Sequence, residues 1–239
     1  MERISMAMHD GHRERLRNRF IEEGLDSFET HNILELALFY AIPRKDTNEI
    51  AHRLLTRFGS LSAVLEAPVQ ELMQVDGISK NSAVFLSLIP ALCRRYYEDR
   101  CSGKCITSVE EAGEYFKPKF IGRTDEVIFF LVLDGKGRVL NCETVSEGVV
   151  NEVNVNVRKL VEISMRYKAT SAILAHHHPN GNALPSEADI ETTWMVRHAL
   201  EFVGVKLTDH IIVADDDFIS LRESRQYKYL FESTPEQED

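Results

Sequence analysis

Apolar side chains recur at helical spacing through the first hundred residues. Residues 13–23 carry them on one face, and residues 32–40 form a strongly apolar stretch that ends before Pro43. Proline is poorly tolerated inside a helix and restricts the residue before it. A new amphipathic helix is therefore expected after a cap at Asp46 or Thr47. Together these positions predict an all-helical N-terminal part.

A tight turn separates two predicted helices at residues 75–79, which read Val-Asp-Gly-Ile-Ser, and an apolar helix follows over residues 81–92. This pattern is typical of a helix-hairpin-helix, in which a glycine permits the turn and the free N–H groups of the second helix can face a phosphate. The more usual hairpin has a second glycine where Ser79 stands. The candidate DNA contacts are Gly77, Ile78, Ser79 and Lys80.

The period of the apolar positions changes beyond residue 119. Residues 127–133 are a continuous apolar run that predicts a buried strand, with a hairpin turn at residues 134–137 and a partner strand over residues 138–145. The further predicted elements are a helix over residues 153–167, a strand over 171–175, a helix over 187–202, and short strands over 211–213 and 218–220. Strands that alternate with helices indicate an α/β or α+β sheet domain.

These patterns predict an α+β protein with two domains. The expected divisions are a helical domain over residues 1–100, a polar linker over 101–117, an α/β domain over 118–226 and a polar tail over 227–239. Cys101 and Cys105 lie in the linker, where a cysteine pair without two further nearby ligands is a weak metal signal.

Charge and composition narrow the classes of function. The 239 residues include 38 acidic and 28 basic side chains, and 44% are hydrophobic, as in a chain that buries a core. The first hundred residues hold 13 basic and 15 acidic side chains, so neither half is a module that binds nucleic acid by charge alone. No run approaches the ~20 apolar residues of a membrane span, and the first residues lack the apolar segment of a secretory signal. We expect a cytoplasmic protein with no membrane partner, whose four cysteines stay reduced.

The most informative stretch is residues 175–189, which read AHHHPNGNALPSEAD. In an extended backbone His176 and His178 point to the same side while His177 faces away. Asp189 lies one turn into the helix that follows, close enough to return as a third ligand. Two imidazoles and a carboxylate suit Zn²⁺ and leave one coordination position for water. The stretch therefore predicts a hydrolytic zinc site.

Two other interpretations apply to the same residues. Ser186 and Asp189 have the spacing of a capping box, in which each side chain satisfies a backbone N–H group of the other residue. A ligand pair that includes His177 is also open, although strand alternation disfavours it.

The run His176-x-His178-Pro179-x-Gly181-x-x-x-Pro185-Ser186-x-x-Asp189 resembles the signature of JAMM (MPN-type) metalloproteases. The whole chain resembles the bacterial RadC family, through this motif, the hairpin and the segments at residues 34–46 and 57–61. The resemblance implies an α/β JAMM/MPN domain, which is cytidine-deaminase-like. It also implies that His176, His178 and Asp189 bind one zinc ion per chain.

The resemblance further implies a reaction on peptide or isopeptide bonds of a protein substrate, with a zinc-bound water as the nucleophile. The family pattern places the catalytic carboxylate just before a core strand, where Glu126 stands, and Glu147 is the alternative. Ser186 would donate a hydrogen bond to the developing oxyanion.

Two further hypotheses come from other classes of function. The first is a DNA-associated repair or recombination factor that contacts phosphate through residues 77–81. The second is an interaction module with a structural metal. A structural hydrogen-bonding role is the expectation for Asp209 and His210, which precede a predicted strand. The arginines at 13, 15, 17 and 19 are read as a solvated helix face.

Overall fold

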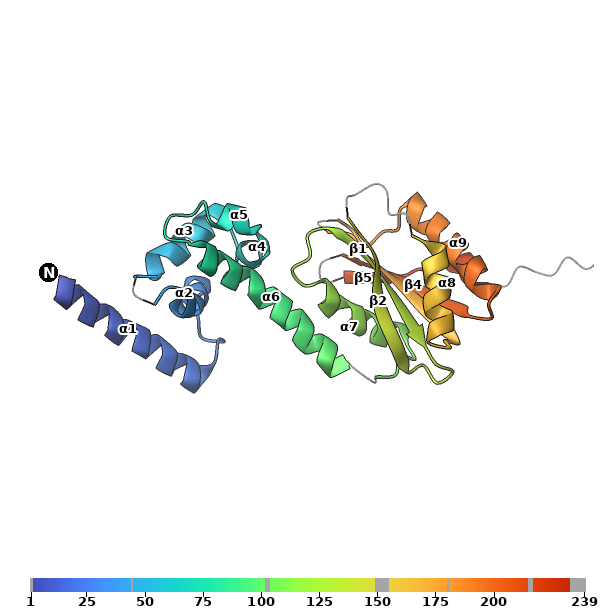
Figure 1. The fold of residues 1–239 in the computed structure, drawn as a ribbon, viewed down its shortest axis with the longest axis horizontal. Coiled ribbons are helices and arrows are strands. Elements are labelled where there is room, and N and C mark those ends of the chain that lie inside the picture. The colour runs from blue at the N-terminus through green and yellow to red at the C-terminus, as the bar shows by residue number, and fades with distance from the viewer. Residues whose placement is uncertain are drawn as a thin grey trace, which may run out of the picture. The chain divides into compact units, whose positions relative to one another are not determined.

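The computed structural model describes residues 2–43, 45–101, 104–148, 155–179, 181–214 and 217–232; the side chains of residues 2–10, 101, 147 and 148 lie outside this description. The chain divides into two compact units, Met1–Cys93 and Arg94–Asp239. The first unit is helical and the second contains a mixed sheet with helices (Figure 1). The predicted fold class, a helical part followed by an α/β domain, is confirmed.

The described part of the first unit contains helices and turns. Its helices are α1 (Glu2–Glu23), α2 (Thr30–Ala41), α3 (Asn48–Phe58), α4 (Leu61–Glu66), α5 (Val69–Leu72) and the first part of α6 (Lys80–Cys101). Their core is aliphatic and includes Leu34, Leu38, Leu54, Leu72 and Leu86. Gly59 ends α3 with a φ of +88°, and the Ser60 hydroxyl then caps α4 by accepting from the N–H of Ala63.

The turn between α5 and α6 depends on Gly77 for two reasons. Its φ is +94°, in the left-handed region that favours glycine. A Cβ at this position would also lie 2.8 Å from Cδ1 of Ile50. Because Ile50 is itself in the core, the close approach holds the turn against α3.

The second unit is built on a five-stranded sheet in the order β2-β1-β3-β4-β5. The strands are β1 (Glu126–Leu133), β2 (Val139–Gly148), β3 (Ser171–His177), β4 (Lys206–Ala214) and β5 (Asp217–Ser220). Among the strands of the described residues, only β3 and β4 pair in parallel; the other neighbours are antiparallel. The helices are α7 (Val109–Phe120), α8 (Val157–Arg166), α9 (Glu187–Glu201) and the 3₁₀ helix η1 (Lys228–Phe231).

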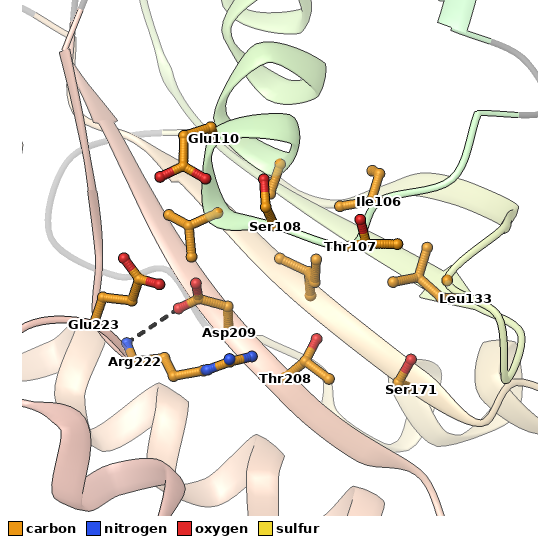
Figure 2. A pocket seen from close by; sticks show the side chains of 14 residues that line it. Ile106, Thr107, Ser108, Glu110, Leu133, Ser171, Thr208, Asp209, Arg222 and Glu223 are labelled. Carbon is orange, nitrogen blue, oxygen red and sulfur yellow. Dashed lines mark hydrogen bonds between the residues drawn. The ribbon is translucent and has the colours of Figure 1, made fainter.

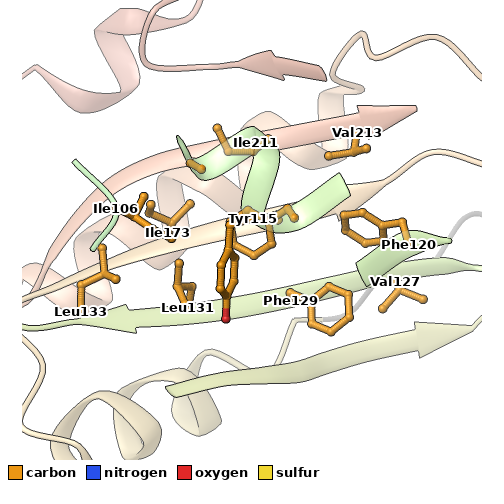
Figure 3. Packing of buried hydrophobic residues seen from close by; sticks show 13 residues of the cluster. Ile106, Tyr115, Phe120, Val127, Phe129, Leu131, Leu133, Ile173, Ile211 and Val213 are labelled. Carbon is orange, nitrogen blue, oxygen red and sulfur yellow. The ribbon is translucent and has the colours of Figure 1, made fainter. Parts of the chain in front are cut away.

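Both faces of the interior strand β1 are buried, which explains its unbroken apolar run. Phe129 and Leu131 pack against α7 in a cluster that includes Tyr115 and Phe120 of that helix (Figure 3). The alternate residues Ile128, Phe130 and Val132 pack on the opposite face with side chains from α8 and α9. Successive side chains of β1 therefore point alternately into two different cores, one on each face of the sheet.

The structure differs from the expected linker at residues 101–117. Helix α7 begins inside that range, behind a capping box of Ser108 and Glu111, and it buries Tyr115 and Phe116 in the core of the second unit. Three glutamates of the helix, Glu110, Glu111 and Glu114, are exposed, and they make the segment resemble a polar connector in the sequence.

Two other expected boundaries also shift. Helix α6 continues past the predicted end at residue 92, although Pro90 lies within it, and the boundary between the units falls inside this helix. Residue 227 was expected to start a polar tail, but η1 follows and buries Leu230.

Candidate metal centre

The sheet and α9 bring the predicted ligands together. His176 lies near the end of β3, opposite Ile128 of β1 and Ile212 of β4. The backbone N–H of His178 donates to the carbonyl of Val213 at 2.8 Å, which holds the residue just beyond the strand. Asp189 lies in the first turn of α9 and is buried. Two β strands and a helix N-terminus therefore position this centre.

The three side chains are in direct contact. Nδ1 of His176 is 2.5 Å from Oδ1 of Asp189, and Nε2 of His178 is 3.3 Å from Oδ2 of the same carboxylate. The two imidazole centroids are 4.7 Å apart and the rings are nearly perpendicular. His176 and Asp189 are buried, whereas His178 is only partly covered. The arrangement has the residue types and proximity that the sequence predicts.

The capping box is present in the same place. The N–H and hydroxyl of Ser186 both donate to Oδ2 of Asp189 at 2.7 Å, and the N–H of Asp189 donates to the hydroxyl oxygen of Ser186. One carboxylate thus serves the helix cap and the histidines together. The single hydroxyl hydrogen of Ser186 is directed at Asp189, so donation to an oxyanion would need the hydroxyl to rotate.

Glu126 is the first residue of β1 and lies beside the histidines. Its Oε2 is 3.7 Å from Nε2 of His176. Glu126, His176 and His178 each offer a potential ligand atom, and these atoms all lie within 4.8 Å of one another. The alternative carboxylate, Glu147, belongs to β2 by its backbone, but its side chain lies outside the described residues.

His177 points to the other face of the sheet, as strand alternation predicts. Its ring stacks on Phe120 of α7 with centroids 4.9 Å apart, and its Nδ1 is 3.4 Å from the carbonyl oxygen of Asp125. Shared coordination of one ion by His177 and its neighbours would therefore need a different strand geometry.

His210 is a further buried group that the sequence did not assign to the centre. It lies on β4 and is fully buried, and a ring nitrogen of His210 lies within 4.8 Å of ligand atoms of His176 and Asp189. Its backbone neighbour on β3 is Leu174, two residues before His176, so the two histidines share a face. The sequence could have assigned His210 to the centre only if β3 and β4 had been known to be parallel neighbours.

Asp209 has the structural role that was expected. Its carboxylate accepts hydrogen bonds from the Ser220 hydroxyl at 2.6 Å and from the N–H groups of His210 and Arg222. It lines a pocket of about 280 Å³ with Thr107, Ser108 and Glu223 (Figure 2). This pocket is at the start of β3 and β4, whereas His176 and His178 lie at and beyond the end of β3.

Electrostatics support a charged carboxylate among these histidines. Burial raises the pKa of Asp189, but hydrogen bonds from His176 and His178 outweigh it and hold that pKa well below its usual range. The same contact with Asp189 raises the pKa of His178. Burial lowers the pKa of His210 to about 3, so this imidazole is neutral near pH 7.

A metal ion fits the donor set. Within the described part of the chain, Nε2 of His176 and Nε2 of His210 are buried and have no hydrogen-bond partner. Buried polar atoms are normally satisfied, so these two nitrogens are candidates for ligation. Imidazole nitrogens and carboxylate oxygens are the usual ligands of catalytic zinc. A pocket of about 610 Å³ opens over the cluster and is lined by Glu126, His176, His178, Ser186, Asp189 and Thr192, among others.

The predicted DNA contacts separate into core and surface residues. Ile78 is buried in the core of the first unit, and Gly77 is packed against Ile50. The Ser79 hydroxyl accepts from the N–H of Ser82 in the first turn of α6, and Lys80 is exposed. Of the four residues, Ser79 and Lys80 present side chains to solvent.

The fold and the site together define a protein with a JAB-type domain, and comparison with known families agrees. The family model described as "RadC-like JAB domain" matches residues 106–227, and the one described as "UPF0758 N-terminal" matches residues 9–84. The chain therefore belongs to the RadC family of UPF0758 proteins.

Similar proteins carry the same family name. A UPF0758 protein of Fusobacterium nucleatum is 35% identical over 90% of this chain and 96% of its own length. One of Rhodobacter capsulatus is 34% identical over 87% of this chain and 97% of its own. One of Ruegeria pomeroyi is 33% identical over 88% and 95%. Among the described residues, no helix is both long and apolar enough to span a membrane.

Proposed function

We propose that this protein is a zinc-dependent hydrolase that cleaves a peptide or isopeptide bond of a protein substrate with water. The observation that carries the proposal is the convergence of Glu126, His176, His178 and Asp189 beneath one open pocket. Members of JAB-domain families are often metal-dependent hydrolases, which supports the same class of reaction.

His176, His178 and Asp189 would hold the zinc ion, since they are mutually in contact and two of the three are buried. Bound zinc lowers the pKa of a water and polarises a carbonyl oxygen. Hydrogen bonds from Ser186 and contacts with two imidazoles keep Asp189 ionised and fix its orientation. A ligand held in this way does not need to reorganise when an ion binds.

Glu126 would move the proton. Its side chain lines the pocket and lies beside His176, whereas the hydrogen bonds of the helix cap are made by Ser186 and Asp189. It would accept a proton from the attacking water and deliver it to the leaving amine. Ser186 would support the oxyanion after its hydroxyl rotates away from Asp189.

Metal content tests the zinc site. Purified full-length protein should contain about one zinc per chain by mass spectrometry, and His178→Ala and Asp189→Asn should each lose it. Wild-type protein that stays metal-free after incubation with zinc and dialysis would contradict the proposal.

Catalysis is tested separately with zinc-loaded protein and a library of peptides and isopeptide-linked conjugates. Glu126→Gln should keep the metal and lose hydrolysis by about 10²-fold or more, because the proton acceptor is removed. Glu187→Gln is the matched control, since Glu187 also lines the pocket but is exposed. Equal turnover by wild type and Glu126→Gln would reject the role of Glu126.

A second candidate function is DNA binding through the hairpin. The observation in its favour is the exposed pair Ser79 and Lys80 at the start of a 22-residue helix, after a turn that only glycine fits well. Free N–H groups and a lysine at such a position suit a phosphate.

The test is binding of duplex and branched DNA over a range of salt concentrations. Lys80→Glu should weaken binding and reduce its salt dependence. Lys45→Glu, which changes the charge of the same unit by the same amount at an exposed residue, should have a smaller effect. Equal losses in the two variants, or no binding at low salt, would contradict the hairpin as a DNA contact.

A further inference from the structure

His210 lies in the core directly behind the proposed zinc ligands. It is fully buried, and its ring is nearly parallel to that of His176, with centroids 6.4 Å apart and an interplanar angle of 16°. It sits on the face of the sheet that α9 covers, as Asp189 and Thr193 of that helix show by their contacts. An imidazole in this position is either a packed core residue or part of the centre.

The hydrogen bonds of Thr193 decide where the proton of His210 lies. The Thr193 hydroxyl donates to the backbone carbonyl of Asp189 at 2.6 Å, which uses its single hydrogen. The same hydroxyl oxygen is 2.6 Å from Nδ1 of His210. It can therefore only accept there, so Nδ1 carries the hydrogen.

A neutral imidazole that is protonated on Nδ1 has a free lone pair on Nε2. This Nε2 is buried and has no hydrogen-bond partner among the described residues. A buried acceptor left in this state costs free energy, so the nitrogen needs a donor or a cation. Nε2 of His176 is buried without a hydrogen-bond partner as well. Two unsatisfied imidazole nitrogens in one cluster point to a cation.

The centre offers two overlapping groups of potential ligands. Glu126, His176 and His178 form the outer group, which lines the open pocket. His176, Asp189 and His210 form the inner group, and their exposed fractions are only 4%, 3% and 0%. Within each group the ligand atoms lie within 4.8 Å of one another, and His176 belongs to both.

We propose that His210 is an additional metal ligand, which completes with His176 and Asp189 a buried coordination position behind the pocket. The inference rests on the proposed function, because it requires that the centre binds a metal. An ion held by the inner group is screened from solvent, whereas an ion that also meets His178 faces the pocket. His210 would thus govern how far the ion is exposed to water and substrate.

The deciding experiment is ¹⁵N NMR of histidine side chains in the full-length wild-type protein during titration with zinc. The ring of His210 is assigned through its bonded connection to the β4 backbone. The expected result is a coordination shift of a ring nitrogen of His210 together with those of His176. A His210 spectrum that stays unchanged at saturating zinc, while His176 and His178 shift, would overturn this inference and leave the proposed function standing. Absence of any zinc-dependent shift would overturn both.

Substitution with Co²⁺ gives a second readout. His210→Gln should bind the metal about tenfold or more weakly, and its visible Co²⁺ spectrum should differ from that of wild type, because a ligand has changed. The control is His198→Gln, the same change at a histidine of α9 that belongs to neither ligand group, and it should keep the wild-type affinity and spectrum. A weaker affinity with an unchanged spectrum in His210→Gln would make His210 an orienting residue and would overturn ligation. If His210→Gln does not fold, the NMR titration of wild type decides alone.

Discussion

Asp189 combines two roles that the sequence presents as alternatives. Its Oδ2 accepts two hydrogen bonds from Ser186, while both carboxylate oxygens contact histidines. The helix cap therefore positions the proposed ligand instead of competing with it. The spacing of Ser186 and Asp189 predicted both a helix cap and a metal ligand. Only the position of β3 shows that Asp189 is placed for both roles.

Replacement of the serine separates the cap from the metal. Ser186→Ala should lower the free energy of unfolding by about 1 kcal/mol, as loss of an N-cap does, and should retain zinc because the three ligands remain. Urea unfolding of the metal-free protein and metal analysis check the two parts. Ser60→Ala, which removes an equivalent cap from α4, should show the loss of stability alone. Complete loss of zinc in Ser186→Ala would make the serine essential to ligand geometry.

A buried carboxylate near the centre makes stability depend on pH. Burial raises the pKa of Asp209 from 3.8 to about 6, against the opposing hydrogen bonds from Ser220 and from the N–H groups of Arg222 and His210. At pH values between 3.8 and about 6, Asp209 keeps its proton in the folded protein but releases it in the unfolded chain. The contribution of this group to stability therefore falls as pH rises through the window, by up to ~1.4 kcal/mol per pH unit.

Asp209→Asn should remove this slope, so its stability relative to wild type should increase as pH rises from about 4 to 6. Urea unfolding of the metal-free proteins at several pH values measures this difference in stability. Asp217→Asn, at an exposed residue, is the control and should leave the slope unchanged. A constant difference between Asp209→Asn and wild type across this range would show that Asp209 titrates normally.

At the scale of elements, the clearest predictions concern strands and helices whose pattern of apolar residues indicates which faces are buried. The continuous apolar run of β1 predicted a strand that is covered on both faces, which the structure confirms. Helix α7 was missed because charged residues interrupt its apolar stripe, although Ala112, Tyr115 and Phe116 lie at helical spacing. Tertiary contact with β1 decides that this segment belongs to the core.

The packing of α7 on the sheet gives a prediction at Gly113. A Cβ there would overlap the ring of Phe218 on β5. Gly113→Ala should destabilise the protein by about 1–3 kcal/mol through overpacking, which exceeds the gain of up to ~1 kcal/mol in helix propensity. Thermal and urea unfolding test the sign. Gly11→Ala in α1, where a Cβ makes only ordinary contact with Arg15, should be neutral or stabilising. A stabilised Gly113→Ala would mean that Phe218 moves aside at little cost.

At the scale of the whole molecule, the two candidate activities lie in different units. The hairpin residues belong to the first unit, and every member of the proposed metal centre belongs to the second. The net charge of −10 is carried mainly by the second half of the chain. Long-range charge therefore does not favour DNA binding at the metal centre, and local geometry must supply any contact at the hairpin.

This division predicts independent effects of substitutions in the two units. Lys80→Glu should leave zinc content and hydrolysis unchanged, and Glu126→Gln should leave DNA binding unchanged. The double variant should show both losses without interaction, because the effects of substitutions at independent sites add. Metal analysis, the peptide assay and DNA titration on the same four proteins measure this. Loss of zinc in Lys80→Glu would show coupling between the units.

The sequence by itself indicated the residue types of the centre. It also placed His177 on the opposite face of the strand from His176 and His178, because strand alternation is a local property of the backbone. It also predicted the hairpin turn, since glycine permits a tight turn; the close approach of this turn to Ile50 is known only from the tertiary structure. Only the tertiary structure decided that His210 joins the cluster and that α7 joins the core. Both depend on which strands and helices become neighbours, and this choice is made by the packing of apolar faces far apart in the chain.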